Sequence, residues 1–459
     1  MRLTTVLVSF FYILVFPFTG YLVVPDSVFA QSSSRDTLQV TFETAQQIAL
    51  ERNPQLLSAE KDIQKARAQI VKSRGNLLPD ISAYTNYSHN FELPIFSISF
   101  GGQTQSFRAG RFENITSGIQ LQQPLYTGGS IWSGLRMAVR GEDLAANQAK
   151  VVKQQVLLQV RQSFYNALYT KQLIQVAREA LNNVQRNLDQ VQKQHDAGTA
   201  SGFDLLRAQV QVANTKPELI AAQHRHEQSL TQLRTAIGLG KDIPIQVAGE
   251  LDYTPTPLEN QSLQDLQNEA LEARPEIQNM HLQRQIQNIS VHTAVAGYLP
   301  KVSLSSNLQF QAQQDNLDLT RQDFIRSISA GLTLSIPLFT GGTNYGQVQQ
   351  AKIELRKLDD QEQQLENGIA AEVESAYYSL LDAKEKIDSQ SQTIQQAHES
   401  LRLAELNYRE GTATQLDILN AQLALQQAQT NYSQYLLQYN VAGDQLRKAV
   451  NQLTFEDQN

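Results

Sequence analysis

The sequence predicts an α+β membrane protein built from two internal repeats. Each repeat is expected to combine a helix, two β-strands, a very long helix and a shorter return helix. Three observations support this fold class. Short motifs recur in the same order in both halves, polar and apolar residues alternate along strand-like stretches, and two very long segments contain no proline.

The first thirty residues are typical of a secretory signal peptide. Arg2 precedes an apolar run that ends near Pro25, and Val28-Phe29-Ala30 is followed by polar residues. We therefore expect residues 1–30 to be removed after Ala30, with an uncleaved membrane anchor as the alternative. The remaining chain has no other apolar run long enough for a membrane-spanning helix. An exported protein of this kind is either soluble in the periplasm or a β-barrel in the outer membrane.

Composition excludes several classes of function. The formal net charge is −7, which argues against nucleic acid as a partner because binding to phosphates needs clustered Lys and Arg. The sequence has no cysteine, which excludes disulfides, zinc-thiolate sites, a cysteine nucleophile and a lipid anchor on an N-terminal cysteine.

The repeats are defined by matching motifs in a constant order. They place the first repeat at residues 31–250 and the second at 251–459. The first repeat carries extra residues only between its Leu-Pro and Pro-Leu motifs, as expected for a surface loop. The matching pairs are Asn53-Pro54 with Arg274-Pro275, Leu78-Pro79 with Leu299-Pro300, Pro124-Leu125-Tyr126-Thr127-Gly128-Gly129 with Pro337-Leu338-Phe339-Thr340-Gly341-Gly342, and Gly198-Thr199 with Gly411-Thr412.

Four strands are predicted, over about 80–92, 112–126, 301–312 and 324–339. Apolar residues alternate with Ser, Asn, Gln, Gly and Thr along these stretches, for example at Val302, Leu304, Leu308 and Phe310. Alternation over about ten residues is typical of a transmembrane β-strand with lipid on one face and water on the other. A half-buried strand of a soluble sheet is the alternative.

Long helices are predicted over about 129–196 and 342–409, with return helices at 203–237 and 415–450 and a further helix at about 264–297. Apolar residues spaced by three and four, as at Leu181, Val184, Leu188 and Val191, indicate a coiled-coil seam. Pro217 predicts a kink or a restart in the first return helix. Residues 238–262 are rich in glycine and proline and are expected to connect the repeats.

Four strands cannot close a barrel, for which about eight are needed. Open strand edges in lipid cost several kcal/mol for each unsatisfied backbone group. Several chains must therefore share one barrel. Three copies supply about twelve strands, and the same copies would pool their long helices into a helical tunnel.

The duplicated motifs resemble those of the TolC family of outer-membrane efflux channels, over essentially the whole chain after the signal peptide. This resemblance implies a homotrimer with a 12-stranded β-barrel in outer-membrane lipid, continued by a periplasmic α-helical coiled-coil barrel. It implies the exit duct of a tripartite efflux or type I secretion system. The implied partners are a periplasmic adaptor protein and an inner-membrane transporter of the RND, ABC or MFS type.

The hairpins after the long helices are the candidate functional site. Asp204 and Asp417 lie in the first turns of the return helices, where a carboxylate can cap free N–H groups. Capping alone could therefore explain both residues. The resemblance also implies a periplasmic gate, in which Asp204 bonds Tyr408 and Asp417 forms a ring of carboxylates. Ala413 and Asn420 stand where family members can carry charged residues, so we expect a less charged gate. The hairpin tips are the expected docking site for the adaptor, at Gly198, Thr199, Leu205, Leu206, Gly411, Thr412, Leu416 and Leu419.

No catalytic constellation is present, and we expect neither enzyme activity nor a cofactor or metal. His224 and His226 lie two residues apart, so on a helix they point in different directions and cannot share a metal. The alternative function is a periplasmic coiled-coil adaptor without a pore. Adaptors normally have one helical hairpin, whereas this chain has two, together with four lipid-patterned strands.

Overall fold

The computed structural model describes residues 37–318 and 320–453. The described residues from Leu38 onward belong to one unit. The signal peptide expected at residues 1–30 lies outside the described residues.

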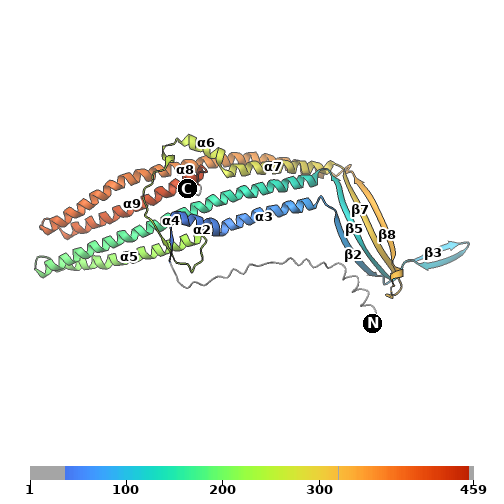
Figure 1. The fold of residues 1–459 in the computed structure, drawn as a ribbon, viewed down its shortest axis with the longest axis horizontal. Helices are drawn as coiled ribbons and strands as arrows, with labels where there is room; N and C mark the ends of the chain where they lie inside the picture. Colours follow the sequence, from blue (N-terminus) through green and yellow to red (C-terminus); the bar gives the residue numbers. More distant parts are fainter. Residues whose placement is uncertain (1–36, 319, 454–459) are drawn as a thin grey trace. The chain divides into compact units, whose positions relative to one another are not determined.

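Two helical hairpins dominate the fold (Figure 1). In the first, α4 (Ser130–Asp196) returns as α5 (Gly202–Ala236), and in the second, α8 (Thr343–Arg409) returns as α9 (Gln415–Ala449). α4 and α8 each have 67 residues. At about 1.5 Å per residue, each helix is roughly 100 Å long. The sequence places these four helices at about 129–196, 203–237, 342–409 and 415–450.

The helices of each hairpin are held together by an apolar seam. In the second hairpin, Leu401 of α8 packs in one buried cluster with Ile418 and Leu425 of α9. In the first, Val184 and Val191 of α4 are buried, seven residues apart on the same side of the helix. This spacing keeps apolar side chains on the facing surfaces of two antiparallel helices, as in a coiled coil.

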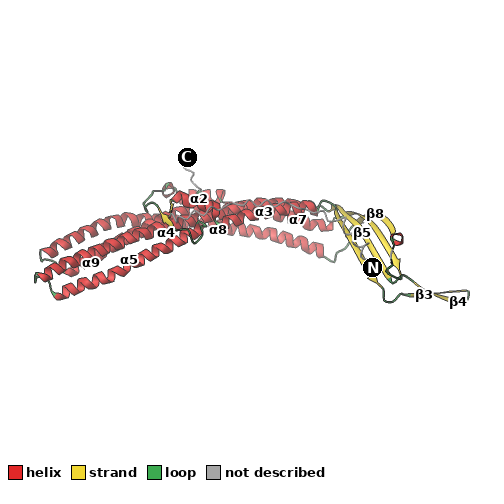
Figure 2. Ribbon diagram, turned by 60° about the horizontal axis from the view of Figure 1, so that its bottom comes forward, coloured by secondary structure: helices red, strands yellow, loops and turns green. Residues whose placement is uncertain are grey.

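The four predicted strands form one antiparallel sheet with the order β2-β5-β7-β8. Figure 2 shows it beyond the ends of α3 and α7. β5 and β7 join the two repeats, and β2 and β8 are the edge strands. The fold is therefore an α+β structure that is mostly helical. The strands are β2 (Asp80–His89), β5 (Glu113–Thr127), β7 (Lys301–Gln314) and β8 (Ile325–Ser335).

The register gives the sheet one apolar and one polar face. Residues opposite each other in neighbouring strands lie on the same face. One row across the sheet is Ala83, Ile119, Leu308 and Ile328. The next row, on the other face, is Ser82, Gln120, Asn307 and Ser329.

The predicted single helix at 264–297 is wrong. The structure has two helices there, α6 (Leu263–Ala273) and α7 (Pro275–Val295), separated at Arg274. Arg274 is extended, with φ −67° and ψ 133°. The cause is Pro275, which disfavours helical geometry in the preceding residue and starts the next helix. The first repeat has the same break between α2 (Phe42–Arg52) and α3 (Pro54–Gly75).

Two strand ends differ from the predictions. β8 ends at Ser335 rather than near 339, because its partner β7 begins at Lys301, which pairs with Ser335. β2 ends at His89, where β5 begins its pairing at Glu113. Pro217 lies inside α5, which continues through it, so the helix does not restart there and a kink stays a prediction.

Two strand pairs are present that the sequence does not predict. β3 (Ile95–Phe100) and β4 (Gln103–Arg108) form a hairpin between β2 and β5. This hairpin occupies the place where the first repeat has its extra residues. β1 (Leu38–Val40) pairs in parallel with β6 (Ile245–Val247). The connecting segment at 238–262 thus carries a strand and ties the beginning of the chain to the junction of the repeats.

A buried charge cluster joins α2, α4 and α9 near this junction. Asp444 is fully buried and accepts hydrogen bonds from Arg161, at 3.0 Å, and from Arg447, at 2.9 Å. Arg161 also donates to Gln46, at 2.9 Å, and lies over the ring of Phe42. The surrounding core is apolar, so these contacts fix how the three helices meet.

Candidate functional site

The Gly-Thr pairs form the tips of the two helical hairpins. Gly198 has φ +73° and Gly411 has φ +74°, a left-handed geometry that glycine adopts without strain. The amide of Thr199 donates to the carbonyl of Gln194, at 2.8 Å, which closes the end of α4. Thr412 makes the same bond to Asn407 at the end of α8, at 2.9 Å. The repeated motif therefore builds two equivalent chain reversals.

Both aspartates after the tips take part in helix caps. The Asp204 carboxylate accepts a hydrogen bond from the hydroxyl of Ser201, at 2.6 Å, and the Asp204 amide donates to that hydroxyl. The Asp417 carboxylate accepts from the hydroxyl and the amide of Thr414, at 2.7 and 2.8 Å. These bonds hold the pKa of Asp417 below its ordinary value. Capping thus accounts for both residues, and Asp417 and Asn420 stay exposed.

The structure brings Asp204 near Tyr408 without bonding them. Tyr408 is partly buried, and its burial, followed by the charge of Asp204, raises the pKa of its hydroxyl. In the described part of the chain, no hydrogen bond joins the two side chains. The carboxylate is instead bonded to Ser201.

The expected docking residues differ in exposure. Leu206 and Leu416 are exposed at 62% and 48%, whereas Leu205 and Leu419 are partly buried. The tip residues Gly198, Thr199, Gly411 and Thr412 are exposed.

Apolar stripes continue from both tips along the return helices. The predicted docking residues do not include Phe203 and Val210, which flank Leu206 on α5 and are 65% and 57% exposed. On α9, Leu423 continues from Leu416 and is also exposed. The spacing of three and four on α5, and of seven on α9, is the sequence signal that could have revealed the two stripes.

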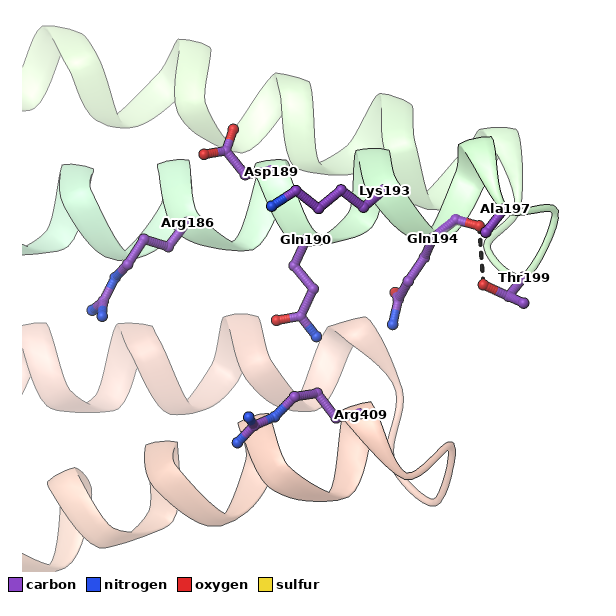
Figure 3. A pocket seen from close by; sticks show the side chains of 8 residues that line it. All are labelled: Arg186, Asp189, Gln190, Lys193, Gln194, Ala197, Thr199 and Arg409. Carbon is purple, nitrogen blue, oxygen red and sulfur yellow. Dashed lines mark hydrogen bonds between the residues drawn. The ribbon is translucent and has the colours of Figure 1, made fainter.

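A groove of about 570 Å³ lies beside the tips, between α4 and the end of α8 (Figure 3). Its wall on α4 carries two cations and one carboxylate, and α8 contributes one further cation. The sequence did not predict this groove, because it depends on how the two hairpins pack. Its lining residues are Arg186, Asp189, Gln190, Lys193, Gln194, Ala197, Thr199 and Arg409.

The polar face of the sheet is lined by amides and hydroxyls. Asn307, Gln309 and Gln311 are alternate residues of β7, and side-chain hydrogen bonds of 3.2 and 3.4 Å join each to the next. Gly118 of β5 leaves room on this face for the ring of Tyr84, because a Cβ there would lie 2.9 Å from it. This face suits contact with water, whereas the opposite face suits contact with lipid.

Within residues 37–318 and 320–453, no group of three or more His, Asp or Glu side chains could hold a metal ion. No helix in these ranges combines the length and apolar character needed to cross a membrane.

Sequence comparison decides the family. The family model described as outer membrane efflux protein matches residues 45–239 and 266–452. This chain belongs to the outer membrane efflux protein family. The resemblance noted from the motifs and the expected location in the outer membrane are thereby confirmed. A transport family is consistent with the absence of a catalytic constellation, and it does not favour a periplasmic adaptor.

Several curated relatives align over most of their length. The outer membrane protein TolC of Vibrio cholerae is 24% identical over 416 residues, which cover 89% of this chain and 90% of the relative. The alkaline protease secretion protein AprF of Pseudomonas aeruginosa is 24% identical over 411 residues, with 87% and 82% covered. The pyoverdine export outer membrane protein OpmQ of the same species is 25% identical over 397 residues, with 83% and 79% covered.

Solved structures share the fold. The outer membrane protein VceC of Vibrio cholerae matches with a TM-score of 0.71 at 18% identity, covering 90% of this chain and 97% of that one. The CmeC outer membrane channel of Campylobacter jejuni matches with a TM-score of 0.72 at 17% identity, covering 93% and 92%.

Proposed function

We propose that this efflux protein is the exit duct of a tripartite efflux or type I secretion system. Three copies share a 12-stranded barrel in the outer membrane and a helical tunnel in the periplasm. Substrates pass through passively, delivered by an inner-membrane transporter of the RND, ABC or MFS type through a periplasmic adaptor. The observation that carries this proposal is the amphipathic four-stranded sheet with β2 and β8 at its edges.

The sheet is suited to lipid only if its edges are paired. Within the described chain, β2 pairs only with β5 and β8 only with β7. Each unsatisfied backbone group in lipid costs several kcal/mol. Pairing of β8 in one copy with β2 in the next satisfies both edges, and three copies close the ring. The apolar face, with Ile81, Ile328, Leu332 and Leu334 exposed, then contacts lipid.

Aromatic side chains at the ends of the sheet support a membrane position. At the end next to the helices, Tyr126, Trp132 and Phe339 are exposed. At the other end, Tyr87 and Phe91 are exposed. Aromatic girdles at both interfaces flank the apolar band of outer-membrane barrels.

The internal repeat supports a threefold tunnel. Within one chain α9 packs against α4, where Gln429 donates to Glu179 at 3.1 Å. By the internal repeat, Gln429 on α9 corresponds to Lys216 on α5. Glu179 on α4 corresponds to Gln392 on α8. If α8 of a neighbouring copy packs on α5 as α4 packs on α9, the contact repeats around a ring and covers the apolar stripe of α5. A head-to-tail interface of this kind forms a closed ring when its rotation closes.

The absence of native cysteines makes this interface directly testable. The double variant Lys216→Cys/Gln392→Cys, treated in outer membranes with a short bis-maleimide, should give covalently linked dimers and trimers. The matched control, Glu179→Cys/Gln429→Cys, should link within one chain and leave the chain mass unchanged. Monomers alone from the first variant, with efficient linking in the control, would refute the trimeric tunnel.

The hairpin tips form the periplasmic entrance in this arrangement. The exposed Asp417 then contributes one carboxylate from each of three copies, and such a ring attracts cations and repels anions. Asp204 closes the entrance when its carboxylate turns from Ser201 to Tyr408. Gly198, Thr199, Gly411 and Thr412, with Leu206 and Leu416, offer small and apolar surface for the adaptor. Asn420, which is neutral and exposed, leaves the ring with fewer charges.

A further inference from the structure

We propose that the groove between α4 and α8 binds an acidic segment of the adaptor, and that the equivalent groove between neighbouring copies does not. The identity of the partner rests on the proposed function. The charge preference of the groove rests on this chain alone, because one chain supplies all of its lining residues.

The groove is cationic in a chain that is negatively charged overall. Three cations, Arg186, Lys193 and Arg409, and one carboxylate, Asp189, line it, whereas the formal net charge of the chain is −7. Within the described residues, none of the three cations forms an ion pair. Electrostatic complementarity therefore favours a partner that brings carboxylates.

The two guanidinium groups have only neutral partners on their own helices. Arg186 donates to the side chain of Asn183. Arg409 donates to the backbone carbonyl of Glu405, at 3.3 Å. Arg186 belongs to α4 and Arg409 to α8. Figure 3 shows the side chains of Gln190 and Gln194 extending from α4 toward α8. Both guanidinium groups keep donors free for a carboxylate placed in the groove.

A simpler explanation covers only part of this pattern. Lys193 and Arg409 lie in the last turns of α4 and α8, where the helix dipole favours cations. Arg186 lies far from the helix end, so the dipole does not account for it. The dipole also predicts cations at every helix end, whereas Asp196 is the last residue of α4 and Glu410 follows directly after α8.

The second copy of the repeat reverses the charges. The positions equivalent to Arg186 and Asp189 are Glu399 and Arg402, which form an ion pair of 2.7 Å. The position equivalent to Lys193 is Leu406, and the one equivalent to Arg409 is Asp196. The groove that these residues would line, between neighbouring copies, also receives Glu410 in place of Ala197. It carries three carboxylates and one cation.

Basic and acidic grooves would therefore alternate around the entrance of the tunnel. Identical adaptor hairpins meet two chemically different sites, and an acidic hairpin surface is attracted to only one of them. The alternation fixes the register in which the adaptor docks, because a rotation by one groove places like charges together.

Disulfide tethering tests the preference. One cysteine is placed in the basic groove by Gln190→Cys and, as the matched control, at the equivalent position by Leu403→Cys. Each purified protein is equilibrated in redox buffer with a helical peptide that carries one cysteine and several glutamates, or the same peptide with glutamines. At low salt, the acidic peptide should label the cysteine at 190 about tenfold more than the neutral peptide, since each exposed ion pair contributes modestly. The cysteine at 403 should show no such preference.

Two further measurements decide between charge and a nonspecific effect. Adding Arg186→Gln, Lys193→Gln and Arg409→Gln to the cysteine variant, or raising the salt, should abolish the preference. Equal labelling by both peptides at position 190, or a preference that survives these substitutions, would overturn the proposal. Because the groove forms within one chain, the result at position 190 is independent of the trimer, whereas the comparison with position 403 assumes it. The cross-linking from position 216 tests the trimer separately.

Discussion

Replacing Asp444 with alanine should destabilise the protein strongly. This carboxylate is fully buried and neutralises Arg161, whose side chain is 5% exposed. Removing one partner of a buried ion pair typically costs about 3–5 kcal/mol, because the remaining charge stays buried without compensation. Arg447, which bonds the same carboxylate, is 31% exposed. Arg447→Ala should therefore cost clearly less than Asp444→Ala, because Arg447 reaches solvent and Arg161 still neutralises the carboxylate.

The assay is pulse proteolysis after equilibration in urea, applied to the purified protein in detergent. Asp444→Ala should move the unfolding midpoint to clearly lower urea than Arg447→Ala does. The double variant Arg161→Met/Asp444→Leu, which leaves no buried charge from this pair, should recover most of the loss. If Asp444→Ala shifts the midpoint no further than Arg447→Ala, or if the double variant loses the sum of both single changes, the pair does not hold the junction as described.

Four further predictions concern the gate, the sheet and pH. Asp204→Ala or Tyr408→Phe should raise single-channel conductance in planar bilayers, and unchanged conductance in both would remove the latch. Asp417→Asn should move the reversal potential toward lower cation preference. Gly118→Ala should reduce the fraction of protease-resistant protein, because the new Cβ would lie 2.7 Å from the carbonyl of Leu308. Gly331→Ala, whose nearest neighbour would be 3.9 Å away, should fold normally. At Glu372, burial opposes ionisation, but hydrogen bonds from Lys448 and Arg274 lower its pKa from 4.5. Its stabilising effect is therefore present above pH 4.5 and lost as the pH falls through the lowered pKa, so Glu372→Gln should destabilise the protein at neutral pH and not in acid.

The sequence predicted the elements whose signals are periodic or repeated. Heptad spacing and the absence of proline indicated α4 and α8, and alternation indicated β5 and β7. The break at Arg274 was visible in the Arg274-Pro275 pair, because proline disfavours helical geometry in the preceding residue. Pro217 did not end α5, so the restart is excluded, whereas the kink stays a prediction.

Features that depend on distant contacts could not be predicted in the same way. The pairing of β1 with β6 joins Leu38 to Ile245, and three-residue strands carry too little sequence pattern to identify. The caps of Asp204 and Asp417 were predictable, because capping needs only local sequence. The basic groove was not, because Arg186 and Arg409 come together only through the packing of two hairpins.

The pairing of β5 with β7 also constrains how the protein is made. Glu113 lies opposite Gln314, so the sheet cannot form until the second repeat has crossed the inner membrane. The buried Asp444 places a similar demand on α9, near the end of the chain. Such long sequence separations make folding slow. In the meantime the first strands expose unpaired edges and apolar side chains, which are prone to aggregation. Unpaired β2 and β5 are therefore the segments most exposed to aggregation until the second repeat pairs with them.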